Sequence, residues 1–231
     1  MKLKKKLFKK EITENPDNRS MSMKSFDIEK NSFDIIESEV GKHTYTKEFE
    51  WDIVRRVIHA TADFEFAHKE KLVFHNDAIA SGFQAIKNKC NIITDVEMVK
   101  VGISQNSLTN LNLKCICKIS DSNIINKAKR LNKTRAETAM INLAQEMNGG
   151  IVVIGNAPTA LQEVIRMVNE KITIPSLIVG VPVGFVSAME SKIELSQSNI
   201  PHITNLGRKG GSAVASSITN ALMLLYMHKK K

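Results

Sequence analysis

The sequence predicts a single α/β domain built on a mainly parallel sheet of about five strands. Short, uninterrupted apolar runs alternate with longer segments in which apolar residues recur at helical spacing. Because neither face of these runs is polar, helices must cover both faces of the sheet, which is typical of parallel strands joined by right-handed crossovers. At 231 residues and 42% hydrophobic, the chain can bury a real core, and its size fits one domain better than two.

Three helices are predicted in the first part of the chain. Residues 26–40 carry apolar side chains at near-helical spacing, and residues 47–60 carry them on one face. His59 lies at the end of the second helix. Asp77 is expected to cap the third, which runs through Ile86. The later helices are predicted at residues 96–101, 122–131, 134–147, 158–170, 187–196 and 211–226.

The predicted strands are the apolar runs between these helices. The clearest is GIVVIG, at residues 150–155, a continuous run centred on β-branched residues. The full set is 91–94, 114–119, 150–155, 175–181 and 201–206.

The two ends of the chain are basic. The net charge of +9 fits an anionic partner, but much of it lies in KLKKKLFKK near the start and HKKK at the end, which weakens that inference. We expect residues 1–25 to be a flexible, polar, basic leader, 26–226 to be the domain, and 227–231 to be a basic tail. Asn15 and Pro16 are expected to break structure in the leader, so a solvated tail is favoured over a membrane or nucleic-acid arm.

Composition excludes several classes of protein. The three cysteines form no CxxC pair and have no histidine at zinc-ligand spacing, so neither a disulfide framework nor a structural metal site is predicted. The apolar stretch 172–186 is interrupted by prolines and glycines, and no run reaches the roughly 18 residues of a membrane span. We therefore expect a cytoplasmic protein in a reducing compartment.

Three glycine-bearing loops follow predicted strands: GNAPT (155–159), GVPVG (180–184) and GRKGGS (207–212). Ligands of open parallel sheets bind beyond the carboxyl ends of the strands, where such loops lead into helices. The first loop offers helix amides to an anion, and the third adds Arg208 and Lys209. Together they predict a carboxylate-binding rim. For each loop alone, a tight turn with ordinary surface cations remains an equal alternative.

The common catalytic signatures are missing. Neither GxGxxG nor a Walker loop is present, nor GxSxG or HExxH, so nucleotide, hydrolase-elbow and zinc-protease sites are disfavoured. His59 stands out because its helix also carries Arg55 and Arg56, and such cations would favour the neutral imidazole. Taken by itself, His59 fits a packing histidine better than a catalytic one.

Six segments, in order, resemble those of the precorrin-8X methylmutase family. They are IHATADFEF (58–66), DVEMVKVGIS (95–104), TRAETAM (134–140), GNAPTAL (155–161), GVPVGFVSAMESK (180–192) and GRKGGSAVASSITNAL (207–222). The resemblance covers about residues 26–226. It implies a three-layer α/β/α fold, a homodimer with pockets near the subunit interface, and an isomerase that moves a methyl group from carbon 11 to carbon 12 of a corrin precursor. It also implies no cofactor, any cobalt being part of the substrate.

The family's histidine, which protonates or hydrogen-bonds the ring during a [1,5]-sigmatropic shift, corresponds to His59. Ser32, Ser104 and Arg135 match further family pocket positions. Where members often have arginine after SFxII, this chain has Glu37, so one expected carboxylate contact is missing or supplied elsewhere, for example by Lys42. The predicted substrate-binding residues are Ser32, Ser104, Arg135, Asn156, Gly184, Arg208 and Lys209.

Two other functions remain as alternatives. A tetrapyrrole carrier would bind the corrinoid product without converting the substrate, and a nucleic-acid-binding module would show binding that falls steeply with salt. The low aromatic content, 5%, argues against base stacking, so we expect no nucleic-acid partner and no membrane partner. The sequence leaves open whether cobalt is already in the ring. We expect the cobalt-loaded form.

Overall fold

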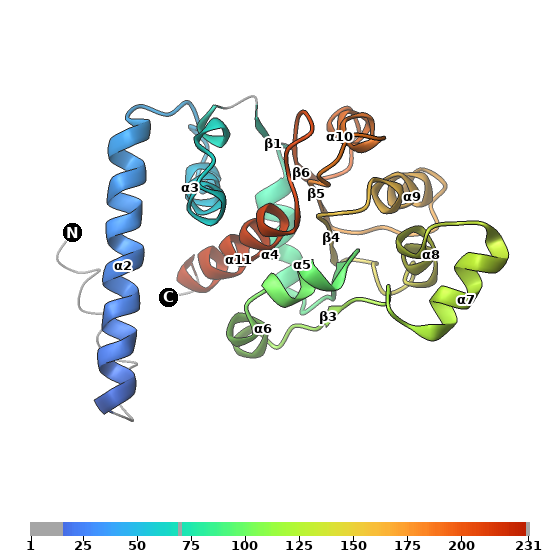
Figure 1. Ribbon diagram of the computed structural model, residues 1–231, viewed down its shortest axis with the longest axis horizontal. Coiled ribbons are helices and arrows are strands. Elements are labelled where there is room, and N and C mark those ends of the chain that lie inside the picture. The colour runs from blue at the N-terminus through green and yellow to red at the C-terminus, as the bar shows by residue number, and fades with distance from the viewer. Residues whose placement is uncertain (1–15, 69–70, 230–231) are drawn as a thin grey trace. The chain divides into compact units, whose positions relative to one another are not determined.

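The computed structural model describes residues 16–68 and 71–229 (Figure 1). The chain divides into two compact units, Met1–Gly41 and Lys42–Lys231. In the first unit the described residues form one helix, α2 (Pro16–Val40). This helix begins ten residues before the predicted start at 26, because proline at a first helical position is compatible with the helix. The predicted leader boundary therefore falls inside α2, and residues 1–15 of that leader lie outside the described residues.

The second unit is built on one six-stranded sheet, with the strand order β1-β6-β5-β4-β2-β3. The five strands from β6 to β3 are parallel, and β1 pairs antiparallel with β6 at the edge. The predicted parallel α/β sheet is confirmed, with one more strand than expected. The strands are β1 (Leu72–Phe74), β2 (Ile92–Thr94), β3 (Cys115–Ile116), β4 (Ile151–Ile154), β5 (Leu177–Gly180) and β6 (His202–Asn205).

Helices cover both faces of this sheet, which gives the three layers that were expected (Figure 1). One layer contains α3 (Glu50–Thr61), α4 (Ala78–Lys87), α5 (Glu97–Gly102), α6 (Gln105–Leu111) and α11 (Ser212–Lys229). The other contains α7 (Ser122–Leu131), α8 (Arg135–Asn142), α9 (Pro158–Asn169) and α10 (Ala188–Ser196). A short 3-10 helix, η2 (Phe64–Ala67), follows α3.

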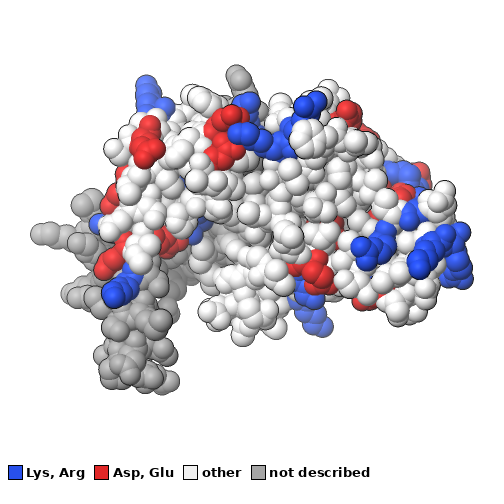
Figure 2. All heavy atoms as spheres, in the orientation of Figure 1, with Lys and Arg blue, Asp and Glu red and all other residues white. Residues whose placement is uncertain are grey.

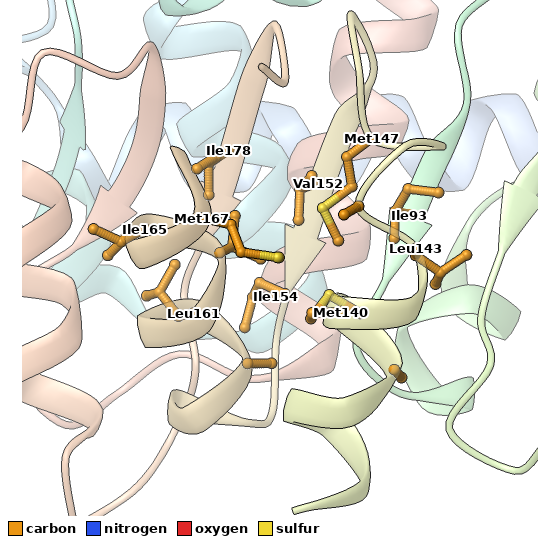
Figure 3. Close-up of a cluster of buried hydrophobic side chains, with 14 of the residues drawn as sticks. Ile93, Met140, Leu143, Met147, Val152, Ile154, Leu161, Ile165, Met167 and Ile178 are labelled. Carbon is orange, nitrogen blue, oxygen red and sulfur yellow. The ribbon is translucent and has the colours of Figure 1, made fainter. Parts of the chain in front are cut away.

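The second layer is attached through a core of aliphatic and methionine side chains (Figure 3). Met140 of α8 and Leu161 of α9 are fully buried against Val152 and Ile154 of β4. Deleting such a buried side chain costs about 2–5 kcal/mol, so this contact is a main source of the domain's stability. It also fixes the starts of α8 and α9 over the carboxyl ends of the strands.

The structure departs from the predictions where elements are short. The predicted strand 114–119 is only Cys115–Ile116, and the predicted helix 134–147 keeps α-helical form only to Asn142. Strand β1 and helix α6 were not predicted. Strand β1 has only three residues, which is too short to show a hydrophobic periodicity in the sequence. It is defined by its antiparallel pairing with β6. Among the described residues, no helix has the length and hydropathy that crossing a bilayer requires.

Candidate functional site

The three glycine-bearing loops follow β4, β5 and β6, which are neighbours in the sheet. Main-chain hydrogen bonds join the loops in sequence. Val183 donates to the carbonyl of Gly155 at 3.4 Å, and Gly184 donates to the carbonyl of Arg208 at 3.2 Å. Gly184 has a φ of 155°, which residues with a Cβ rarely adopt. The loops therefore form one continuous surface, called here the carboxyl rim.

The main-chain amides of the GNAPT loop that precede α9 bind a carboxyl group of the protein itself. The buried carboxylate of Asp95, at the end of β2, accepts hydrogen bonds from the main-chain N–H groups of Gly155, Asn156 and Ala157 at 3.1, 2.7 and 2.7 Å. Burial raises the pKa of Asp95, and the three amides act in the opposite direction. These three loop amides therefore already have an acceptor within the protein, and sequence reasoning missed Asp95.

The side chain of Asn156 is nevertheless exposed at the rim. The starts of α8 and α9 adjoin, because the hydroxyls of Thr134 and Thr159 are 2.9 Å apart. Thr134 also caps α8 by accepting from the amide of Glu137. Arg135 is thereby the first residue of α8, exposed, on the same rim as the GNAPT loop.

Lys209 is an ion-paired residue rather than an isolated rim cation. Its ammonium lies 2.9 Å from a carboxylate oxygen of Asp63 and 3.1 Å from one of Glu65, both in the segment after α3. These carboxylates raise the pKa of Lys209 through hydrogen bonds. In Figure 2, acidic and basic side chains adjoin at the top of the molecule, above β1 and β6 in the view of Figure 1. No local sequence pattern signals this pairing, because 146 residues separate the partners.

Arg208 carries the other charge of this loop. Its guanidinium lies 5.5 Å from the centroid of the Phe185 ring, on the loop after β5. Both side chains are exposed, and Phe185 is 83% exposed. A cation stacked on an exposed aromatic ring offers both a charge and an apolar face to a ligand.

His59 lies in the last turn of α3 and is exposed. The helix buries Ile53, Val54, Val57 and Ile58 against its neighbours and ends at Ala62, whose left-handed conformation lets its amide donate to the carbonyl of Ile58. Asp63, which bridges to Lys209, follows only four residues after His59. Four residues of chain span at most about 14 Å, so His59 lies within about that distance of Asp63, which contacts Lys209.

Ser104 and Ser32 have local hydrogen bonds. Ser104 is the N-cap of α6, where its hydroxyl accepts from the amide of Ser107 and its own amide donates to Asn220 of α11. The hydroxyl of Ser32 donates to the carbonyl of Ile28 within α2. Ser32 lies in the Met1–Gly41 unit, so it is not among the residues that the Lys42–Lys231 unit brings together.

A pocket of about 220 Å³ opens at the rim between η2 and the loop after β6. Asp63, Glu65 and Lys71 line one side of it, and Arg208 and Lys209 line the other. A larger hollow of about 860 Å³ lies at the amino ends of β4, β5 and β6, where Gly149, Ser176 and Pro201 contribute to its wall. None of the predicted site residues lines that hollow. We assign the site to the rim, because ligands of parallel sheets bind at the carboxyl ends.

The described residues contain no group of three histidine, cysteine or acidic side chains placed to hold a metal ion. The cysteines Cys90, Cys115 and Cys117 are free, and burial raises the pKa of the Cys115 thiol to about 12. A thiol with so high a pKa is a poor nucleophile.

Comparison with known proteins assigns the family. The model of the family described as precorrin-8X methylmutase matches residues 27–225. The chain is 46% identical over 198 residues to the cobalt-precorrin-8 methylmutase of Priestia megaterium, covering 86% of this chain and 87% of the relative. It is 37% identical over 169 residues to the precorrin-8X methylmutase of Pseudomonas aeruginosa, covering 72% and 80%.

The fold agrees with this assignment. The crystal structure of the precorrin-8x methyl mutase from Thermus thermophilus superimposes with a TM-score of 0.81 at 34% identity, covering 88% of this chain and 97% of the other. The match spans the sheet, both helical layers and all three rim loops, so the chain belongs to the precorrin-8X methylmutase family, whose members are isomerases.

Proposed function

We propose that this enzyme moves a methyl group from carbon 11 to carbon 12 of cobalt-precorrin-8 and forms cobyrinate. The observation that carries the proposal is the family match over residues 27–225, which includes the exposed His59 at the end of α3. The shift is intramolecular: the bond from the methyl group to carbon 11 breaks while a bond to carbon 12 forms. No electrons or atoms are gained or lost, so we expect no cofactor.

His59 is proposed as the group that donates a proton or a hydrogen bond to the ring during the [1,5]-sigmatropic shift. Charge is redistributed over the conjugated ring as the methyl group moves, and a placed donor contributes about 10²- to 10⁴-fold to such a step. Imidazole suits this task near neutral pH. It is exposed in the last turn of α3, where a ligand at the rim can reach it.

Arg208 and Arg135 are proposed to bind carboxylates of the ring. Corrin precursors carry many carboxylate side chains around a largely apolar macrocycle. A guanidinium binds a carboxylate with two parallel hydrogen bonds, and exposed Phe185 offers an apolar face beside Arg208. Lys209 and Asn156 are then secondary contacts, since Asp63 and Glu65 already neutralise the lysine.

A second copy of the chain is proposed to complete the pocket. The rim pocket of about 220 Å³ in one chain is smaller than the roughly 300–1,000 Å³ of ordinary ligand sites, and a tetrapyrrole is a large ligand. Beside it, Phe185 and Val186 are 83% and 81% exposed, which is unusual for adjacent large apolar residues. A homodimer in the cytoplasm, with this surface at its interface, accounts for both observations.

The cobalt-loaded ring is the proposed substrate. The relative described as acting on cobalt-precorrin-8 is 46% identical to this chain, and the relative described by the metal-free name is 37% identical. Incubation of the purified protein with cobalt-loaded and with metal-free precorrin-8 tests the proposal. The expected result is conversion, followed by the change in the absorption spectrum of the ring at unchanged mass, with a higher kcat/KM for the cobalt form.

Other outcomes of the same experiment separate the alternatives. Tight binding of product with no conversion of either ring would identify a carrier. Failure of both rings to bind, together with salt-dependent binding of an oligonucleotide, would support the nucleic-acid reading.

A further inference from the structure

A buried lysine lies beneath the loop that carries Arg208. Lys192 of α10 has 0% of its surface exposed, although lysine is almost never fully buried. Its ammonium lies 2.6 Å from the main-chain carbonyl oxygen of Lys209 and 3.4 Å from the side-chain oxygen of Asn205. Both of these partners are neutral, and burial lowers the pKa of Lys192 to about 8. Burying an ammonium group between neutral partners costs free energy, and Lys192 lies in a segment that matches the family. A role for Lys192 in the function of the rim would account for this cost.

The partners of Lys192 are Asn205, the last residue of β6, and Lys209, which lies in residues 206–211, called here the β6–α11 loop. The carbonyl of Lys209 accepts a second hydrogen bond, from the side-chain amide of Asn205 at 2.7 Å, so both of its lone pairs are used. The amide of Gly211 donates to the carbonyl of Val181 at 2.9 Å. A Cβ on Gly210 would lie 2.3 Å from that carbonyl, so the loop lies directly on the strand end. Among these donors, Lys192 is the charged one.

The opposite side of the loop is held by η2. The ammonium of Lys209 lies 2.9 Å from Asp63, which follows His59 by four residues. Lys209 is therefore held twice: its carbonyl by Lys192 of α10 and its side chain by the segment that continues α3. This leaves Arg208 as the side chain that the loop directs to the rim, over Phe185.

We propose that Lys192 is a positioning residue whose ammonium holds the main chain of the β6–α11 loop, so that Arg208 meets a ring carboxylate beside the His59 end of α3. This inference rests on the proposed function. A hydrogen bond from an ammonium is shorter and about twice as strong as a neutral one, so Asn205 alone replaces it only in part. Without Lys192, the loop samples more conformations and Arg208 is less often in place.

The test uses Lys192→Met, which keeps the length of the side chain and removes its charge. Because Lys192 does not approach His59 in sequence or in its contacts, KM is expected to rise about tenfold with kcat changed less than about threefold. The affinity for the product, measured with cobyrinate, should fall by a similar factor. Lys192→Arg should recover part of the affinity, since it restores a charged donor. Circular dichroism and the melting temperature check that each variant is folded.

A matched control is Lys87→Met. Lys87 is exposed in the last turn of α4, which leads to the amino end of β2, so this change removes the same charge from the other side of the sheet. Its KM and product affinity should equal those of the unaltered chain. A Lys192→Met protein with unchanged KM and product affinity overturns the inference. So does one that loses thermal stability alone.

A second measurement does not depend on the ligand. Amide hydrogen exchange of residues 207–211, in the protein without ligand, should be faster in Lys192→Met than in Lys87→Met, because the loop is less firmly held. Equal exchange shows that Lys192 does not hold the loop, whatever the protein binds. If exchange increases while the unaltered chain neither binds nor converts a corrin, the loop anchor stands and the proposed function fails.

Discussion

A carboxylate oxygen of Asp95, at the end of β2, lies 2.7 Å from the main-chain nitrogen of Asn156, in the loop that follows the neighbouring strand β4. With the amides of Gly155 and Ala157, this hydrogen bond completes a set of three donors around one buried carboxylate. The start of α9, and with it the GNAPT part of the rim, is therefore held by a charge from inside the protein. This arrangement shapes the GNAPT part of the rim, and we propose that the arginine side chains supply the contacts to anions.

Replacing Asp95 with alanine should destabilise the domain strongly. The change leaves one buried and two partly buried amides without their acceptor, and each buried donor left unsatisfied costs about 1–3 kcal/mol. Urea unfolding, followed by circular dichroism, measures the loss. Asp121→Asn is the control, because Asp121 is exposed and its side chain makes no capping hydrogen bond with α7. A loss below about 1 kcal/mol in Asp95→Ala would contradict this role.

This relationship also shows what the sequence could not predict. The strands β4 and β5 were predicted from local pattern alone, because an apolar run that is buried on both faces carries its own signal. The acceptor for the GNAPT amides is 61 residues away from Asn156 in the chain, and nothing near the loop marks Asp95. Local pattern identifies an anion-binding loop but does not show which anion fills it.

The same limit applies to charges. Lys209 and Lys192 both lie in segments that resemble the family's. From sequence pattern alone, a lysine at either position is expected to be an exposed surface cation. The fold pairs the first with Asp63 and buries the second completely. Both outcomes depend on which elements pack together. The contact between Thr134, which precedes Arg135, and Thr159 of the GNAPT loop is likewise a result of packing, and no local pattern predicted it.

His59→Ala should abolish conversion of precorrin-8 while leaving product affinity within about threefold. The imidazole is proposed to act on charge that develops during the shift, so its loss lowers kcat by about 10²- to 10⁴-fold and affects ring binding little. Single-turnover conversion and equilibrium binding of cobyrinate separate the two effects. Near-normal turnover in this variant would remove His59 from the mechanism.

The matched control is His228→Ala. His228 is also exposed and also lies in the last turn of a helix, α11. It follows the start of α11 by 16 residues, about 24 Å along the helix from the rim. The His228→Ala protein should turn over substrate as fast as the unaltered chain. That result would show that removing an exposed histidine has no effect by itself.

Arg135→Ala should weaken ring binding about tenfold or more, since a bidentate contact with a carboxylate is lost. Titration of product, followed by the absorption of the ring, gives the affinity. Arg130→Ala removes the same charge from the last turn of α7 and serves as the control. Similar affinities in the two variants would show that Arg135 contributes general charge or structure, and no specific contact.

Lys192 should also make stability depend on pH in a defined window. Burial lowers its pKa from 10.5 to about 8 in the folded protein, whereas the unfolded chain keeps the ordinary value. Between these values the unfolded state binds more protons than the native state, so raising the pH through this window stabilises the fold. Below pH 8 the native state carries the full cost of the buried charge, and that cost is relieved as the pH rises.

The measurement is the difference in unfolding free energy between the unaltered chain and Lys192→Met, from urea titrations at pH 7.0 to 9.5. The unaltered chain should gain stability relative to the variant above about pH 8, with no change in the difference below about pH 7.5. Burial raises the pKa of Tyr45, which acts in the opposite direction at higher pH, but Tyr45 is present in both proteins and cancels in the difference. A constant difference across the range would mean that Lys192 keeps its proton in the folded state as firmly as in the unfolded chain, and that the buried ammonium is stabilised by more than the two oxygens it contacts.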